Sequence, residues 1–172
     1  MKAIIICKSV HQNNTEKIAK AMAKKLGARL VKPEDVKPDE LMGYDIVGLG
    51  SGIYAGRHHA SILGLAEKLP CPETEKKAGK AGKKKAGRSG NKSGKMAGMP
   101  EIFVFSTAGF PSKLWHRALK KRLEGKGFSI SGEFRCRGFD TFGPFRIIGG
   151  LNKRHPDRKD IRKAERFAES LG

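Results

Sequence analysis

Short apolar runs alternate along the chain with longer amphipathic segments. Residues 2–7 (KAIIIC), 44–51 (YDIVGLGS) and 101–107 (EIFVFST) are too short for helices and predict strands that are buried on both faces. Residues 28–33 predict a further strand that is closed by a proline, and residues 128–140 predict a fifth, with clearer alternation of apolar and polar positions. Strands without a polar face are typical of a parallel sheet.

Segments with helical periodicity follow four of these five strands. Apolar residues recur at helical spacing in residues 15–27, 58–69, 113–127 and 156–171. The first of these segments carries its lysines late and ends at a glycine, as helices commonly do. Strands that alternate with helices predict an α/β fold: a right-handed, doubly wound parallel sheet of five strands with helices on both faces, in three layers.

One segment departs from this pattern. Residues 73–98 consist almost entirely of lysine, glycine, alanine and serine and carry eight lysines, one arginine and two glutamates. Such a segment cannot bury enough apolar surface to offset the entropy of ordering it. We therefore expect a flexible, exposed insertion at about 73–98 within a single domain that spans residues 1–172.

The composition narrows the possible functions without choosing one. The chain has 172 residues and a formal net charge of +19, which raises the question of nucleic acid or another anionic partner. The insertion alone accounts for +7 of this charge. The sequence contains no apolar stretch long enough to span a membrane, and its three cysteines have neither disulfide nor zinc spacing, so we expect a cytoplasmic protein.

Ligands of open α/β sheets bind beyond the carboxyl ends of the strands, and this rule selects three loops. The first is the polar loop that joins the first strand to its helix. Backbone N–H groups there, with side-chain donors from Ser9, Asn13, Asn14 and Thr15, suit a phosphate without any lysine or arginine. The loop matches neither GxxxxGK[ST] nor GxGxxG, and its asparagine and threonine side chains could equally cap the helix.

The other two loops suit a flat ring. In residues 50–59 the glycines allow a ligand to approach the backbone, while Ile53 and Tyr54 offer apolar and aromatic surface. The histidine pair His58 and His59 lacks further ligand spacing, and we expect it to begin the next helix rather than to bind a metal. In residues 106–111 the small side chains of the first four residues, Ser106 to Gly109, leave room for the edge of a ring.

With these loops placed, the sequence resembles the flavodoxin family, and most closely its short-chain group. The resemblance extends through SVHQNNTEKIA, GLGSGIYAGRHH, VFSTAG and GFDTFGPFRIIGGLNKRHPDRKDIRKAERFA, which is nearly the whole chain except the basic insertion. It implies strand order 2-1-3-4-5 and the cofactor FMN. Flavodoxin is itself the standard example of FMN held where the strand order reverses, so this placement follows from the resemblance.

The resemblance also assigns cofactor contacts. The phosphate loop of the family falls on Ser9, His11, Asn13, Asn14 and Thr15; the loop that flanks the ring falls on Ser51, Gly52, Ile53 and Tyr54; the last contact loop falls on Thr107, Ala108 and Gly109. The third loop has small residues where many flavodoxins carry an aromatic ring, so Phe110 or Phe139 would have to take that place. No catalytic acid, base or nucleophile and no metal ligand is predicted.

Residues 138–157 follow the last strand and contain Phe139, Phe142, Phe145, Ile147 and Ile148. Two interpretations stay open at this point. The loop either packs its aromatic residues against the edge of the sheet or forms a wall of the ligand or partner site.

The leading functional hypothesis is an electron-transfer flavoprotein that shuttles electrons between redox partners, for which the basic body favours acidic proteins such as ferredoxin-like ones. Two alternatives remain. One is a flavin-dependent oxidoreductase that resembles the quinone-dependent protoporphyrinogen oxidases, which share the fold and a similar GxSIxYGxxH stretch. The other is a nucleic-acid-associated protein that uses the basic segment 73–98.

Overall fold

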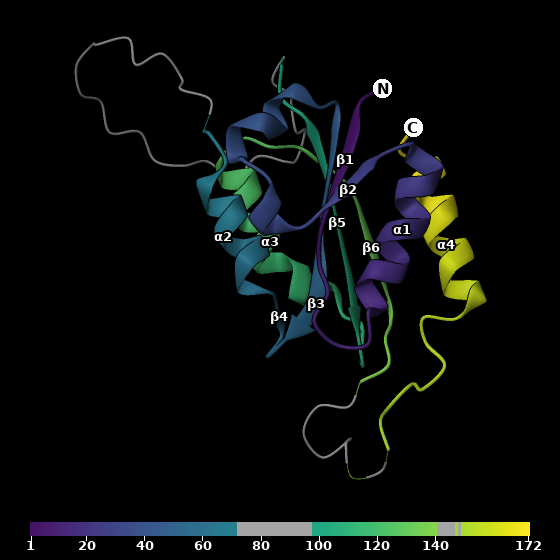
Figure 1. The fold of residues 1–172 in the computed structure, drawn as a ribbon. Coiled ribbons are helices and arrows are strands. Elements are labelled where there is room, and N and C mark those ends of the chain that lie inside the picture. Colours follow the sequence, from purple (N-terminus) through teal and green to yellow (C-terminus); the bar gives the residue numbers. More distant parts are fainter. Residues whose placement is uncertain (72–97, 141–146, 148) are drawn as a thin grey trace, which may run out of the picture.

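The computed structural model describes residues 1–71, 98–140, 147 and 149–172. In chain order the elements are β1 (Ala3–Lys8), α1 (Asn14–Leu26), β2 (Arg29–Val31), the 3₁₀ segments η1 (Pro33–Asp35) and η2 (Pro38–Gly43), β3 (Ile46–Tyr54), β4 (Arg57–His58), α2 (Ala60–Lys68), β5 (Glu101–Ala108), the 3₁₀ segment η3 (Lys113–His116), α3 (Arg117–Gly125), β6 (Ile130–Arg137) and α4 (Arg158–Glu169). Strands β1, β2, β3, β5 and β6 run in one direction from the end that carries the N-terminus, and the loops after β1, β3, β5 and β6 lie at the opposite end (Figure 1).

The sheet has the order β2-β1-β3-β5-β6, and neighbouring strands on this path are parallel. This confirms the predicted order 2-1-3-4-5 for the five parallel strands, of which β5 and β6 are the fourth and fifth. The order reverses beside β1, because β2 lies on one side of it and β3 on the other. The two crossovers that start there leave in opposite directions, which opens a crevice at the carboxyl ends of β1 and β3.

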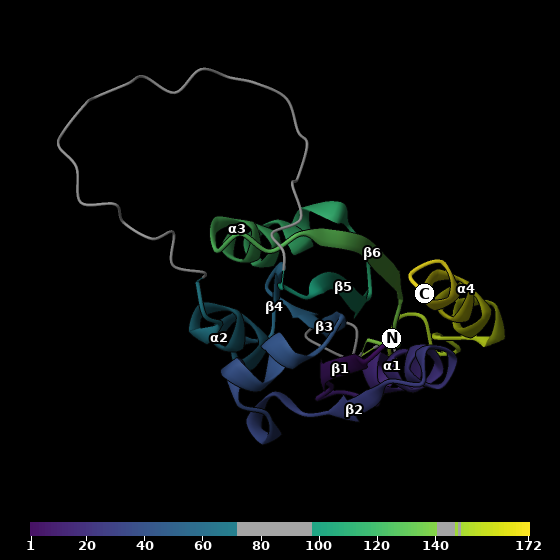
Figure 2. The same ribbon diagram turned by 90° about the horizontal axis from the view of Figure 1, so that it is seen from above.

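Helices cover both faces of the sheet. Viewed along the strands, α1 and α4 lie on one face and α2 and α3 on the other (Figure 2). Each face has its own hydrophobic cluster, and the two clusters use alternate residues of the same strands, as Ile4 and Ile6 against Ile5 show. Strands buried on both faces therefore explain the continuous apolar runs of the sequence.

The middle strand β3 is rich in glycine because large aromatic rings lie across it. A Cβ atom added to Gly48 would lie 2.3 Å from Cζ of Phe103, and one added to Gly50 would lie 2.3 Å from Cζ of Phe105. Both phenylalanines come from the adjacent strand β5 and are fully buried. Residues 48 and 50 thus leave the space that the two rings fill.

Local structure differs from the sequence-based expectation at two places. The connection from β2 to β3, for which no element was predicted, contains the two 3₁₀ segments η1 and η2, each opened by a proline. The helix expected over residues 58–69 begins only at Ala60, because Arg57 and His58 form the short strand β4, which pairs antiparallel with β3. The expected helix from 113 begins as the 3₁₀ segment η3 and becomes α-helical at Arg117.

Two expectations concern segments outside this description. The basic insertion at 73–98 falls almost entirely outside the described residues, as do Phe142, Phe145 and Ile148. Within the described part of the chain, none of the helices has both the length and the apolar character that crossing a bilayer requires.

Candidate functional site

A pocket lies at the carboxyl ends of β1, β3, β5 and β6, where the strand order reverses. Its volume is about 460 Å³, within the range of roughly 300 to 1,000 Å³ that is typical of small-molecule sites. The residues that line it are Ser9, His11, Asn14, Thr15, Gly52, Ile53, Tyr54, Ala55, Thr107, Ala108, Gly109, Gly138, Phe139 and Asp140. Most of this lining consists of backbone, apolar atoms and neutral polar groups, with Asp140 as its one carboxylate.

All three predicted loops meet in this pocket. Ten of the twelve predicted cofactor contacts line it, namely Ser9, His11, Asn14, Thr15, Gly52, Ile53, Tyr54, Thr107, Ala108 and Gly109. The other two do not. The side chain of Asn13 is exposed just before α1, and Ser51 is fully buried behind the pocket wall.

The first loop presents backbone donors to the pocket. Gln12 and Asn13 both have left-handed backbones, with φ of 55° and 52°, directly before α1 begins at Asn14. The step from a left-handed backbone at Asn13 to a right-handed helical one at Asn14 is a combination that gathers N–H groups into a concave nest for an anion, and the positive end of the helix dipole adds to it. The loop can therefore hold a phosphate with neutral groups alone.

Two buried hydroxyls join this loop to the neighbouring strand. Thr15 Oγ1 and Thr107 Oγ1 lie 2.7 Å apart in a buried hydrogen bond, which connects the first turn of α1 to the end of β5. Asn14 connects the start of α1 to the segment after β6, because its Nδ2 donates to the carbonyl of Phe139 at 2.7 Å. The amide oxygen of Asn14 is buried and has no partner among the described residues, so a ligand donor would satisfy it.

The second loop is a tight hairpin. Ala55 and Gly56, with φ of 47° and 74°, form the two-residue turn between β3 and β4, and positive φ at both positions is typical of a type I′ turn. The turn places the ring of Tyr54 at the pocket, 5.9 Å from the ring of His11. Burial raises the pKa of Tyr54, against a hydrogen bond from the backbone of Val10. Tyr54 therefore bridges the first and second loops as a neutral phenol.

Ser51 supports the hairpin from behind. Its hydroxyl donates to the carbonyl of Gly52 at 2.7 Å and accepts from the backbone N–H of His59 at 2.9 Å. Since the single hydroxyl hydrogen is used, Nδ1 of His58, 3.0 Å away, must be the donor in their hydrogen bond. The other ring nitrogen of His58 is then a buried acceptor, and it has no partner in the described part of the chain.

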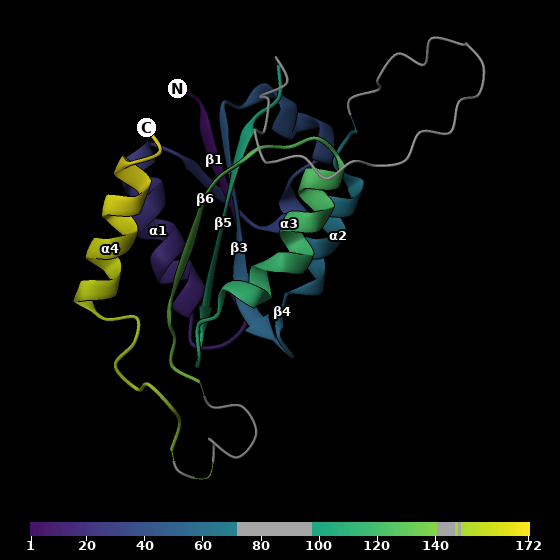
Figure 3. The same ribbon diagram turned by 180° about the vertical axis from the view of Figure 1, so that it is seen from behind.

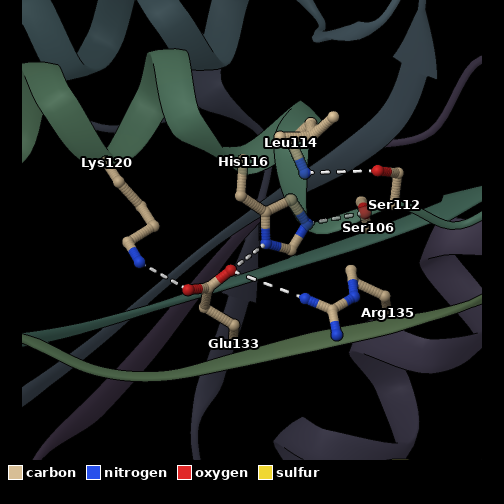
Figure 4. A network of polar contacts seen from close by, with 7 residues as sticks. All are labelled: Ser106, Ser112, Leu114, His116, Lys120, Glu133 and Arg135. Carbon is tan, nitrogen blue, oxygen red and sulfur yellow. Dashed lines mark hydrogen bonds and ion pairs between the residues drawn. The ribbon is translucent and has the colours of Figure 1, made fainter.

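A second buried histidine, His116, extends this arrangement, and the centroids of its ring and the His58 ring are 5.0 Å apart. Nε2 of His116 lies 2.7 Å from the hydroxyl of Ser106, and its Nδ1 lies 3.1 Å from the carboxylate of Glu133 (Figure 4). Burial lowers the pKa of His116, which outweighs the opposite effect of Glu133. A neutral ring that donates from Nδ1 to the carboxylate and accepts the Ser106 hydroxyl hydrogen at Nε2 satisfies all three groups.

Glu133 connects the histidine to the surface. Burial opposes its ionisation, but hydrogen bonds and the nearby charge of Lys120, with a contribution from His116, lower its pKa overall. Arg135 adds a longer ion pair at 3.7 Å. Ser51 and Ser106 are register partners on β3 and β5, and the next pair along these strands, Gly52 and Thr107, lines the pocket. The hydrogen bonds of the two serines with His58 and His116 therefore lie directly behind the pocket wall and hold it in place.

One cluster has the composition of a metal site. Ligand atoms of His155, Asp157 and Asp160 lie within 4.8 Å of one another. Their contacts are those of a helix start: Asp157 accepts from the backbone N–H groups of residues 159 and 160, and Asp160 accepts from the backbone N–H of Asp157 and from the His155 ring. We therefore interpret the cluster as the capping box of α4.

Four pocket residues were not among the predicted contacts: Ala55, which lies in the hairpin turn, and Gly138, Phe139 and Asp140. Gly138, Phe139 and Asp140 follow β6 and close the pocket on that side, which supports the second interpretation of this loop for its described part. Their position after a strand was the available signal. Of the two aromatic residues considered for the place left by the small third loop, Phe139 lines the pocket, whereas Phe110 does not line it and is 64% exposed.

The polar groups of the pocket fit FMN. A neutral nest at a helix start suits the phosphate, the partnerless amide oxygen of Asn14 suits a ribityl hydroxyl, and the Tyr54 and Phe139 rings suit a flat heterocycle. The buried cysteines offer no competing chemistry at this place. Burial raises the pKa of Cys7 to about 12, which leaves it an unreactive thiol.

Comparisons with known proteins point in the same direction. A family model described as flavodoxin domain matches residues 4–69. MJ0298 of Methanocaldococcus jannaschii, a protein described as uncharacterized, is 43% identical over 173 residues, which covers 99% of this chain and 98% of that protein. Similarity at this level extends from end to end of both chains.

Solved structures share the fold at low sequence identity. Oxidised flavodoxin 2 from Bacillus cereus superposes with a TM-score of 0.64 at 18% identity and covers 99% of this chain and 97% of its own. A flavodoxin from the domain Archaea gives 0.59 at 13%, with 99% and 96% covered. Rubredoxin oxygen:oxidoreductase from Desulfovibrio gigas gives 0.64 at 15%, and the match covers 35% of that longer chain.

Proposed function

Because the chain belongs to the flavodoxin family, we propose that it binds FMN in the pocket at the strand ends and carries electrons between redox partners. The observation that carries this proposal is the convergence of three separate loops on one pocket whose phosphate end is neutral and whose other end is aromatic. FMN, when bound, supplies a ring that exchanges one or two electrons.

The protein's own contribution is to hold and shield the ring. The N–H nest before α1, with Ser9 and Thr15, would hold the phosphate. The backbone of Gly52 would face the ring edge, and Tyr54 and Phe139 would flank it. Ser51, His58 and His116 do not line this pocket; their hydrogen bonds hold the ends of the strands that form its wall.

Titration of the purified protein with FMN and with riboflavin, which lacks the phosphate, tests the proposal. We expect FMN fluorescence to be quenched, the melting temperature to rise, and FMN to bind about ten-fold or more tightly than riboflavin, since charge-assisted hydrogen bonds to the phosphate are lost with the latter. Saturating FMN that causes neither quenching nor thermal stabilisation would overturn the proposal.

A variant pair sharpens the test of the phosphate loop. Thr15→Val removes a hydroxyl at similar size, and we expect it to reduce the preference for FMN over riboflavin. Ser131→Ala removes an exposed hydroxyl at the far end of β6 and is the matched control. The ratio of the two affinities is informative even if Thr15→Val lowers stability, because both ligands then meet the same weakened protein.

The finer assignments are part of the same proposal. We expect the redox partners to be acidic proteins, ferredoxin-like ones among them, since the chain carries a formal charge of +19. Free cysteine thiols suit the reducing environment of the cytoplasm, where we place the protein.

A further inference from the structure

Large exposed apolar side chains gather at one end of the molecule. Among the described residues they are Met1, Val10, Phe110, Leu114 and Ile147. All except Met1 lie in segments that follow β1, β5 or β6, at the end of the sheet away from the two termini (Figure 3). The residues that line the pocket come from the same end. Val10 lies between two residues that line the pocket, and Phe110 directly follows another, so both are at the pocket mouth. Exposed apolar groups beside a pocket are typical of a contact surface for another molecule.

Exposed cations stand among these apolar groups. Arg57 pairs with Tyr54 in the hairpin, Arg137 immediately precedes the pocket residue Gly138, and Lys113 begins the segment η3, which packs against β4. Within the described part of the chain, none of these three cations forms an ion pair. Lys8, at the end of β1, differs because it contacts Glu34 at 2.6 Å.

A second hollow, of about 550 Å³, lies beside the first and shares His11 and Tyr54 with it. Arg57 and His59 line it together with Val10. Nδ1 of His59 accepts from the backbone N–H of residue 61 at 3.1 Å, so its Nε2 carries the hydrogen of the neutral ring. The hollow thus offers a guanidinium and an N–H donor beside apolar surface, which suits a carboxylate side chain of a partner.

We propose that Val10, Arg57, Phe110, Lys113, Leu114 and Arg137 form the docking surface for an acidic face of a small redox protein, with the second hollow receiving one of its carboxylates. We call these six residues the mouth surface. The proposal rests on the proposed function for the electron exchange. The docking itself depends only on charge and apolar contact, and it can be measured separately.

Charge complementarity selects this occupant over the others. A second copy of the chain would bring a like charge of +19 to the contact, which long-range repulsion disfavours. A nucleic acid would use the cations and leave Val10 and Leu114, 49% and 71% exposed, without apolar contact. An acidic protein surface with apolar groups at its centre uses both features, as protein interfaces commonly do.

The test measures binding of the full chain to an acidic plant-type ferredoxin and to basic cytochrome c, by calorimetry at low and high salt. We expect the ferredoxin to bind, to lose affinity as salt increases, and to bind about ten-fold more weakly to the double variant Arg57→Glu with Lys113→Glu. Lys24→Glu is the control: it changes an exposed lysine in the last turn of α1, at the other end of the sheet, and should leave the affinity unchanged. Leu114→Ser should weaken binding without changing its salt dependence.

The possible results separate the two proposals. Ferredoxin binding that depends on the mouth surface supports docking whether or not FMN binds, because calorimetry does not require the cofactor. Equal loss of affinity in Lys24→Glu, or equal binding of cytochrome c, would overturn the docking proposal. The docking proposal would also be overturned if the chain bound single-stranded DNA or phosphatidylserine vesicles but not ferredoxin, and if the double variant abolished that binding.

Discussion

The buried ring of His58 makes a sharp prediction about acid stability. Burial, with a smaller contribution from His116, lowers the pKa of His58 to about 3, whereas an unfolded histidine titrates at about 6.5. Above pH 6.5 the ring is neutral in both states and pH has no effect through it. As the pH falls through 6.5, the unfolded chain binds a proton that the folded chain does not, so the free energy of unfolding decreases.

The size of the effect follows from these two values. At pH 5 the unfolded ring is almost fully protonated and the folded ring is not, so this one group should lower the free energy of unfolding by about 2 kcal/mol relative to pH 8. The variant His58→Asn removes this pH-dependent contribution to the free energy of unfolding. Its amide can still donate to the Ser51 hydroxyl as Nδ1 of the histidine does, and an amide does not titrate in this range.

Urea unfolding of both proteins at pH 8 and pH 5 measures the effect. The loss of lateral ring packing will lower the stability of His58→Asn at both pH values, so the informative quantity is the difference between them, which should be about 2 kcal/mol smaller in the variant. His59→Asn is the control, because His59 is only partly buried and should give a smaller change. An unchanged pH difference in His58→Asn would refute the assignment of a buried, neutral imidazole.

Three further predictions concern packing, and urea unfolding measures each of them. Gly50→Ala should lower the free energy of unfolding by about 1–3 kcal/mol, because its Cβ would lie 2.3 Å from the ring of Phe105; an unchanged midpoint would mean that the ring moves freely. Gly64→Ala should raise the free energy of unfolding by about 0.5–1 kcal/mol, since it lies within α2 with no atom within 4 Å of the added carbon. Thr107→Val should cost about 1–2 kcal/mol, because it leaves the buried hydroxyl of Thr15 without its partner, and a neutral result would show that this hydroxyl finds another.

The sequence by itself determined the architecture. Apolar runs such as 2–7 and 101–107 are local signals, and once strands and helices alternate, parallel pairing and right-handed crossovers leave few arrangements. The position of the pocket followed as well, because the carboxyl ends of parallel strands share one edge. This explains why loops separated by about 90 residues, such as those with Thr15 and Thr107, could be assigned to one site.

The tertiary structure alone decided which side chains face that site. Ser51 was expected at the cofactor, yet it points to the opposite side of the wall, because its hydroxyl is held by His58 and by the backbone of residue 59. No spacing in the sequence connects positions 58 and 116. Their contact depends on β4 folding back along β3 and on η3 packing against it.

The physical reason for this division is the range of the interactions. Helical and strand periodicity reflect neighbours within one turn or one pleat, so a sequence displays them directly. The partners of Ser106 and Glu133 are fixed instead by strand register and by which polar groups burial forces to pair, and both depend on the assembled sheet.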